Sequence, residues 1–175
     1  LELSGDPVSV VDGVVGGSIG AAPFSLSANG VLAYRTQSGG PRLVGLDETG
    51  KEHEAHELEG GITGVRLSPD GKNAALSLTG RDGSDVWLLD RTRRVAERLG
   101  FDPTWDDSPV WSPDGRSIAY SGGSFIVVID LDARETDVTK MTLRVRGSPT
   151  DWTPDGRFLI YEKEGDLFAL PLEEG

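Results

Sequence analysis

Two histidines and three glutamates alternate in one short segment, and this pattern could bind a divalent metal ion. Residues 51 to 57 read KEHEAHE, and His53 and His56 are the only imidazoles of the chain. Imidazole nitrogens and carboxylate oxygens are ligands that Zn²⁺ and Mn²⁺ accept. Positions i and i+3 of a strand point to opposite faces, however, so both histidines can bind one ion only where the strand ends or bulges between them. A solvated, charged edge strand is the simpler interpretation, unless a second chain supplies further ligands.

A second set of residues could bind a ligand at the mouth of a central channel, if the repeats described below form a ring. Trp105 lies on a loop beside Asp106 and Asp107, and an aromatic side chain next to carboxylates is a typical ligand contact. Arg66 and Asp151 each stand two residues before a recurring turn, so they are expected to line the channel together. Acidic groups at such a mouth can also hold Ca²⁺ or a transition metal that activates water for hydrolysis. A polar, water-filled channel is the simpler alternative.

One segment matches a nucleophile motif without the structural context that the motif needs. Residues 16 to 20 read GGSIG, which fits the G-x-S-x-G pattern around a catalytic serine. That pattern activates the serine only on a sharp turn from a strand into a helix. Ser18 lies in a Gly-rich connection with no helical pattern after it, so we interpret the segment as a loop.

The overall charge excludes several classes of partner. The chain has 17 Lys and Arg against 29 Asp and Glu, a net charge of −12, and such a surface repels nucleic acid and anionic membranes. It has no Cys, which excludes a disulfide framework, a thiolate zinc site and a Cys nucleophile. No stretch approaches the roughly 18 apolar residues of a membrane span. The chain also begins without Met or a signal-like segment, so we expect an excised or processed piece.

The elements that position these residues are set by an internal repeat. Four segments align on a turn, and they read SLSANGVLAY from residue 25, RLSPDGKNAAL from 66, VWSPDGRSIAY from 110 and DWTPDGRFLIY from 151. The turn residues Ser27, Ser68, Ser112 and Thr153 are therefore 41, 44 and 41 positions apart. A period of 20 to 50 residues indicates a repeat architecture. In each turn, Pro presets φ and Gly supplies the positive φ that closes a tight hairpin.

Short apolar runs around these turns predict strands and almost no helix. Each unit holds an inner strand before the turn, a second strand after it, a third that ends near Asp47, Asp90 or Asp130, and an outer one. Four short antiparallel strands per repeat are typical of one blade of a β-propeller. We therefore predict an all-β chain, a single β-propeller domain over 1–175 or an arc of one. Its four blade-like repeats cover about 21–58, 59–99, 106–141 and 147–172.

The last repeat has residues for three strands, and this leaves the closure of the ring open. Residues 6 to 11 read DPVSVV and could supply the missing outer strand of the last blade. Alternatively, the chain is an arc of a larger ring, or two such arcs join as an eight-bladed homodimer.

The tryptophans fit either alternative: Trp111 and Trp152 immediately precede their turns and are predicted to pack between blades, and Trp87 is predicted to be core. The recurring aspartates at the ends of the third strands are interpreted as turn formers.

These residues resemble the TolB-like β-propeller repeats of bacteria, whose hallmark is a WSPDG turn followed by an apolar strand. The match is close at Trp111–Gly115 and Trp152–Gly156, good at Leu67–Gly71 and degenerate at Ser27–Gly30, and it extends over about Phe24–Leu172. The chain also looks like the extracytoplasmic propeller region that follows eukaryotic-like serine/threonine kinase domains in some bacterial proteins. The resemblance implies a periplasmic or extracytoplasmic location and, because that region usually continues further, a fragment of a larger protein.

Two functions remain open at this point. The resemblance implies a binding module that presents a ring face to a protein or a small ligand, with Trp105, Asp106, Asp107, Arg66 and Asp151 as its contacts. The alternative is a metal-dependent hydrolase of esters or phosphotriesters with Zn, Mn or Ca, for which His53 and His56 are the candidate ligands. The repeat motif itself is architectural, so it predicts the fold more directly than the function.

Overall fold

The structure is a computed structural model, and it describes residues 24–27, 32–35, 42–46, 51–100, 105–132 and 140–172. Several predictions fall outside these residues: the strand at 6–11, the G-x-S-x-G segment with Ser18, the turn former Asp47 and the loop at 101–104. The side chain of His53 is also outside the description. In the described part, no helix is long and apolar enough to cross a membrane.

Within the described residues the chain is all β, as the repeats predict, and its strands form four antiparallel sheets. The first sheet contains β1 (Phe24–Leu26), β2 (Leu32–Arg35), β3 (Arg42–Leu46) and β4 (Glu52–Glu57). The second contains β5 (Gly61–Leu67), β6 (Asn73–Thr79), β7 (Ser84–Asp90) and β8 (Val95–Arg98). The third contains β9 (Asp106–Trp111), β10 (Ser117–Gly122), β11 (Phe125–Asp130) and β12 (Lys140–Arg146). The fourth contains β13 (Ser148–Trp152), β14 (Phe158–Lys163) and β15 (Asp166–Pro171).

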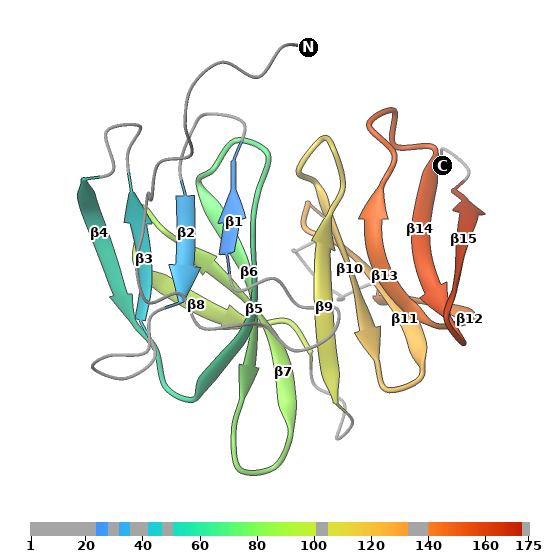
Figure 1. Cartoon of the computed structure of the whole chain (residues 1–175), viewed down its shortest axis with the longest axis horizontal. Helices are drawn as coiled ribbons and strands as arrows, with labels where there is room; N and C mark the ends of the chain where they lie inside the picture. The colour runs from blue at the N-terminus through green and yellow to red at the C-terminus, as the bar shows by residue number, and fades with distance from the viewer. Residues whose placement is uncertain are drawn as a thin grey trace, which may run out of the picture.

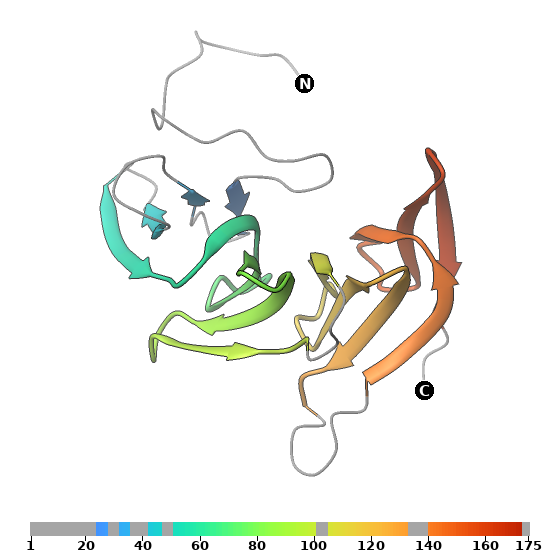
Figure 2. The same ribbon diagram turned by 90° about the horizontal axis from the view of Figure 1, so that it is seen from below.

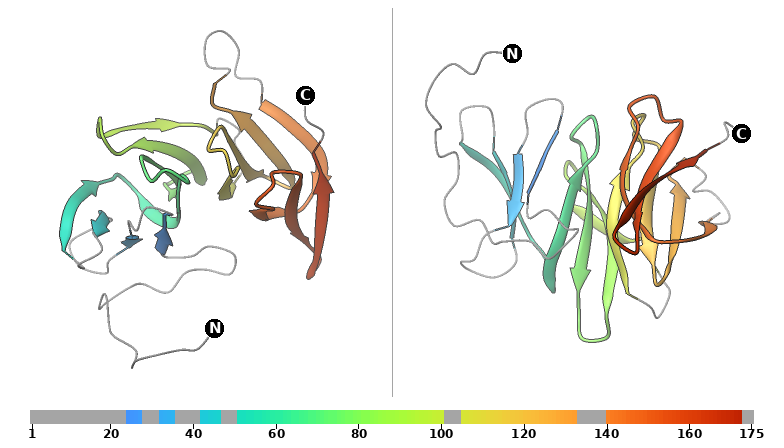
Figure 3. Two further views of the ribbon diagram at one scale, coloured as in Figure 1. Left: turned by 90° about the horizontal axis from the view of Figure 1, so that it is seen from above. Right: turned by 45° about the vertical axis from the view of Figure 1, so that its right-hand side comes forward.

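The sheets stand side by side as the blades of a propeller arc (Figure 1). In every sheet the strands pair in chain order, and β1, β5, β9 and β13 are the inner strands, because these strands contact one another between neighbouring sheets. All four inner strands run upward in Figure 1, so the turns that follow them gather at one end of the arc. Views along the other axis show that the first and fourth sheets flank an open side (Figures 2 and 3).

Each complete SPDG-type turn is fixed by one hydroxyl and one carboxylate. Ser112 Oγ donates to Asp114 Oδ1 (2.6 Å) and accepts from Ser117 N–H (2.8 Å), while Arg116 N–H donates to Asp114 Oδ1 (3.0 Å). The same bonds recur in the turns that begin at Ser68 and Thr153. These donors hold the pKa of each turn aspartate below its usual value, and the Ser or Thr hydroxyl is the largest cause. The turn glycines adopt positive φ, for example +72° at Gly115, which confirms their predicted role.

The hydrophobic core lies between consecutive sheets. One cluster joins the first and second sheets, a second joins the second and third, and a third joins the third and fourth. Trp111 is buried in the second of these clusters, and its Nε1–H donates to the carbonyl oxygen of Arg66 on the neighbouring sheet (3.0 Å). Trp152 packs half-buried against the third sheet, and Trp87 packs against the cluster between the first two sheets. The predicted inter-blade packing of Trp111 and Trp152 is therefore confirmed.

A bulge interrupts the pairing of the inner strand in the second, third and fourth sheets. The register shifts between Ile62 and Gly64, opposite Tyr120, and between Pro149 and Asp151. A β-bulge inserts an extra residue and changes the direction of the side chains that follow it. The bulges therefore lie directly upstream of the residues that face the centre of the arc.

Candidate functional site

The candidate site is a pocket at the turn end of the inner strands, and all four sheets contribute to it. Its volume is about 290 Å³. Ser25, Arg66, Val110 and Asp151 line it, one from each inner strand, and each stands two residues before its turn. Side chains at equivalent positions of parallel inner strands face the same direction, which is why the repeat phase brings them together. The structure thus brings Arg66 and Asp151 to one pocket, and their contact with a ligand stays a prediction.

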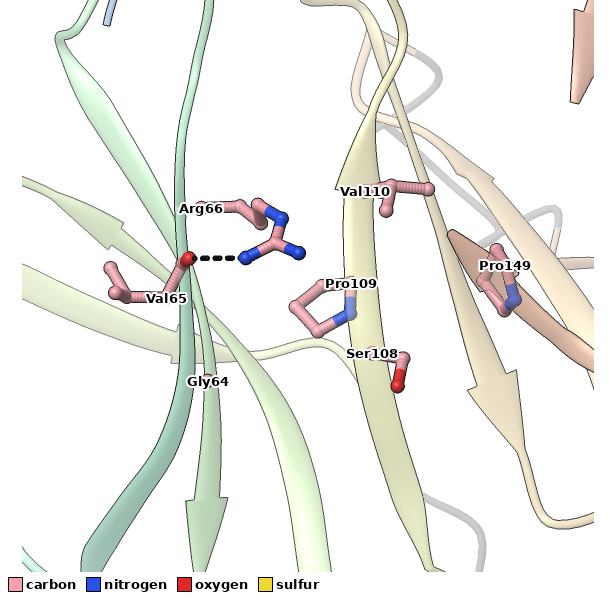
Figure 4. Close-up of a pocket in the computed structure, with 7 residues that line it drawn as sticks. All are labelled: Gly64, Val65, Arg66, Ser108, Pro109, Val110 and Pro149. Atoms are coloured by element: carbon pink, nitrogen blue, oxygen red, sulfur yellow. Dashed lines mark hydrogen bonds between the residues drawn. The ribbon is translucent and has the colours of Figure 1, made fainter. Parts of the chain in front are cut away.

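Arg66 is the central cation of this pocket. Its guanidinium is half-buried between β5 and β9, and Nη1–H donates to the carbonyl oxygen of Val65 (3.1 Å; Figure 4). Burial lowers the pKa of Arg66 from its usual value, and the nearby charge of Asp151 partly opposes this shift. None of the ion pairs among the described residues joins Arg66 and Asp151. The two groups therefore face the pocket as separate charges of opposite sign.

The remaining walls are apolar and hydroxylic. Trp111, Trp152 and the prolines of the three SPDG-type turns line the pocket, together with Ser27, Ser68 and Ser112. A smaller cavity of about 10 Å³ lies deeper, between Gly64, Ser108 and Pro149, and has room for about one water molecule (Figure 4). A pocket of apolar walls with a few convergent polar groups is the usual form of a small-ligand site.

The pocket lies at the end of the inner strands, whereas Trp105, Asp106 and Asp107 lie where the inner strand β9 begins. Asp106 and Asp107 begin β9, whereas Val110 near the end of the same strand lines the pocket. Val110 is four positions after Asp106, which is roughly 13 Å of extended strand. Trp105 is largely exposed, and its carbonyl oxygen accepts from Gly123 N–H (3.1 Å). The structure therefore does not bring these three residues together with Arg66 and Asp151.

The burial of Asp106 differs from the exposed position expected of a loop residue. Its side chain is fully buried, and a Cβ added at Gly100 would meet its Oδ2 at 1.9 Å. Asp106 thus occupies space that the glycine leaves free in the connection after β8. A contact of Trp105, Asp106 or Asp107 with a ligand stays a prediction.

His56 lies on β4 together with His53, as the sequence places them, and its side chain is buried. It pairs with Leu43, which belongs to the core between the first and second sheets. Burial lowers the pKa of His56, and the charge of Arg94 adds to this shift. Among the described residues, no group of three or more His, Cys, Asp or Glu side chains is arranged to hold a metal ion. Nothing in the described part therefore supports a metal centre at the histidine segment.

Some pocket residues were not singled out from the sequence. Val110 and Ser25 were recognised only as phase equivalents of Arg66, and the tryptophans and turn serines were interpreted as structural. The signal that could have found them is the same repeat phase, because the pocket lining falls between two residues before and one residue after the turn position of each repeat. The bulges that redirect the inner strands have no comparable signal in the residue types.

Comparison with known proteins identifies the fold. The chain is 40% identical over 57 residues to the Tol-Pal system protein TolB of Alcanivorax borkumensis, which is 30% of this chain and 13% of that protein. It is 26% identical over 170 residues to dipeptidyl-peptidase 5 of Porphyromonas gingivalis, covering 75% of this chain and 23% of the peptidase. The chain thus spans less than a quarter of either relative. No protein-family model matches it.

Solved structures give the same result over more of the chain. TolB from Acinetobacter baumannii superposes with a TM-score of 0.61 at 20% identity, covering 85% of this chain and 39% of TolB. The putative TolB from Agrobacterium tumefaciens gives 0.63 at 22% identity, covering 85% and 57%. A chain of the mitotic checkpoint complex gives 0.68 at 13% identity, covering 98% and 56%. These likenesses show that the chain folds as a TolB-like β-propeller region.

Proposed function

We propose that this chain is a binding module, which holds a protein segment or a small ligand in the pocket between Arg66 and Asp151. The observation that carries the proposal is that one residue from each of the four inner strands converges on this pocket, and that two of the four carry opposite charges. The half-buried guanidinium favours an anionic group, because a partly desolvated charge gains more from a partner than an exposed one. Asp151 favours a cationic group on the other wall. The ligand we expect therefore carries both signs of charge, as a peptide segment does.

The proposal includes an extracytoplasmic, most simply periplasmic, location. Its support is the likeness to TolB proteins of the Tol-Pal system. Fractionation of the source cells with an antibody against the chain tests this location. Recovery of the protein from the cytosol alone would contradict it.

No observation in the described residues favours the hydrolase alternative. One relative is named a peptidase, but the match extends over only 23% of that protein. The pocket is lined by Arg66, Asp151 and four serines, and its lining contains no imidazole or second carboxylate that could act as a base for them. We therefore propose binding without chemistry at this pocket.

A peptide library displayed on phage and panned on the immobilised chain tests the binding role. Peptides recovered are titrated by following the fluorescence of Trp111 and Trp152, which line the pocket. Arg66→Gln should weaken binding by about tenfold or more, because a charge-assisted hydrogen bond contributes roughly 1.5 to 3 kcal/mol. The matched control is Arg81→Gln, an exposed arginine of the β6–β7 turn outside this pocket. Peptides that bind wild type and Arg66→Gln equally, or panning that enriches nothing, would refute the proposal.

A further inference from the structure

A second groove lies between the first and second sheets, at the end where β6 and β7 join. This is the end of the strands opposite to the SPDG-type turns (Figure 1). Its volume is about 670 Å³, and its walls are the connection from β4 to β5 and the β6–β7 turn. Every residue that lines it falls within 57–96. The groove therefore belongs to an internal interface of the arc and not to either of its end faces.

The floor of the groove is apolar and includes an indole. Leu58, Leu78 and Ala96 line it together with Trp87. Trp87 pairs with Leu76 across the sheet, which places it on the face that contacts the first sheet. The indole is half-buried, because it packs against the core of that interface and also lines the groove. The face of an indole is the aromatic surface that attracts a cation most strongly.

Trp87 departs from the pattern of the repeat. Val44 and Val127 stand at the equivalent positions of the first and third sheets, each paired with the second strand of its sheet. They are 1% and 3% exposed, so a valine fills this position where only core packing is needed. The larger side chain in the second sheet therefore adds surface that reaches beyond the interface.

One wall of the groove carries two free carboxylates. Glu57 ends β4 and Glu59 follows in the connection to β5, and both are exposed and line the groove. Neither forms an ion pair with another of the described residues. Asp85 also lines the groove, but its Oδ1 is bonded to Arg98 Nη2 (2.6 Å). The two glutamates thus leave a negative charge beside the indole without a cation of the described residues to balance it.

The positions of the walls are set by a close backbone contact and a turn. Gly60 has a φ of +91°, and a Cβ there would meet the carbonyl oxygen of Thr79 at 2.8 Å, so the connection lies directly against the end of β6. Arg81 lines the groove from the β6–β7 turn. It is exposed and forms no ion pair with another described residue. A donor group therefore faces the two carboxylates across the apolar floor.

We propose that this groove binds a segment of a partner protein that carries an arginine beside apolar residues. The planar guanidinium would stack on the indole of Trp87 and pair with Glu57 and Glu59. The apolar neighbours of that arginine would cover the floor. Arg81 would donate to backbone carbonyl oxygens, which a protein segment has and a small free cation lacks. This site is separate from the pocket between Arg66 and Asp151, and it does not depend on what that pocket binds.

The composition of the chain itself favours a partner as the source of the cation. Among the segments outside the described residues, 1–23, 28–31, 36–41, 47–50, 101–104 and 173–175 contain no Lys or Arg. The remaining one, 133–139, contains Arg134 and joins β11 to β12 in the third sheet. The segments that are adjacent in sequence to the groove therefore have no cationic side chain to place on Trp87.

The indole N–H signals of the four tryptophans give a direct test. In a ¹H–¹⁵N spectrum of the chain, the signal that is lost in Trp87→Phe identifies Trp87. The probe is a capped tripeptide of arginine between two leucines, compared with the same peptide with glutamine in place of arginine. The arginine peptide should shift the Trp87 signal and leave those of Trp111 and Trp152, which line the other pocket, in place. Equal shifts with the glutamine peptide, or no Trp87 shift at about 5 mM peptide, would overturn the proposal.

A pair of double variants tests the two carboxylates without changing the core. Glu57→Gln with Glu59→Gln should weaken binding of the arginine peptide about fivefold, because each exposed ion pair contributes modestly. The matched control is Glu164→Gln with Asp166→Asn, which removes the same charge from exposed positions around the β14–β15 turn and should leave binding unchanged. Equal affinities of the two double variants would contradict the site. Capped arginine that binds as tightly as the tripeptide would rule out a protein segment as its ligand.

Discussion

Two tryptophans at equivalent positions allow the value of one inter-blade hydrogen bond to be measured. Trp111 and Trp152 both stand immediately before a turn, and both pack on the preceding sheet. Trp111 Nε1–H donates to Arg66 O at 3.0 Å, whereas Trp152 Nε1 is buried without a hydrogen-bond partner among the described residues. Replacing each by Phe removes the N–H and keeps most of the apolar ring. The pair therefore separates the bond from the packing.

The expected costs follow from these contacts. Trp111→Phe leaves the Arg66 carbonyl without its donor and should lower the free energy of unfolding by about 1 to 3 kcal/mol. Trp152→Phe leaves no acceptor unpaired, so it should cost about 1 kcal/mol less than Trp111→Phe. Full truncation, Trp111→Ala, should cost about 3 to 5 kcal/mol, a large part of the about 5 to 15 kcal/mol that stabilises a typical domain.

Urea unfolding followed by far-ultraviolet circular dichroism is the appropriate assay, because each substitution removes one of the four tryptophans and so changes the fluorescence signal itself. The slope of the free energy against urea should be unchanged, which shows that the surface exposed on unfolding is the same. The reasoning is refuted if Trp152→Phe costs as much as Trp111→Phe within about 0.5 kcal/mol. The hydrogen bond from Trp111 to Arg66 would then add no stability beyond that of the packed ring.

Three further predictions concern ionisation and backbone geometry. Because the pKa of buried His56 is lowered, the unfolded chain binds more protons near pH 6, so stability should fall as pH decreases below about 6.5, and His56→Gln should flatten this slope in pH-dependent urea melts. The pKa of Asp114 is lowered by Ser112, so its contribution should be fully present above about pH 4 and lost as pH falls further; Asp114→Asn should reduce the acid dependence, and an unchanged acid limb would contradict the bonding described. Gly147→Ala should destabilise by about 1 to 3 kcal/mol, since φ is +142° and a Cβ would meet a backbone oxygen at 2.6 Å, whereas thermal melts of Gly80→Ala should match wild type because nothing lies within 4 Å.

Much of the fold could be predicted because the repeat is a local signal. Pro, Gly and the Ser–Asp pair act within a few residues of each turn, so Ser112 and Gly115 define their hairpin without help from the rest of the chain. The pocket position of Arg66 and Asp151 followed for the same reason, since a shared phase on equivalent strands points side chains to the same place. Sequence alone therefore determined the blades and one pair of the candidate site.

Burial and separation along the strands were decided by the tertiary structure. Asp106 is buried where Gly100, which follows β8, leaves room for its carboxylate. His56 is buried on β4, where it pairs with Leu43 of the core between the first two sheets. Trp105 lies at the far end of β9 from the pocket, which only the strand's direction fixes. The exposure of Leu26 and Leu167 at the two ends of the arc is a property of sheet packing as well: equivalent residues are covered wherever a neighbouring sheet is present. The residue types at these positions are those of a blade interface, and the packing of neighbouring sheets decides which of them are buried.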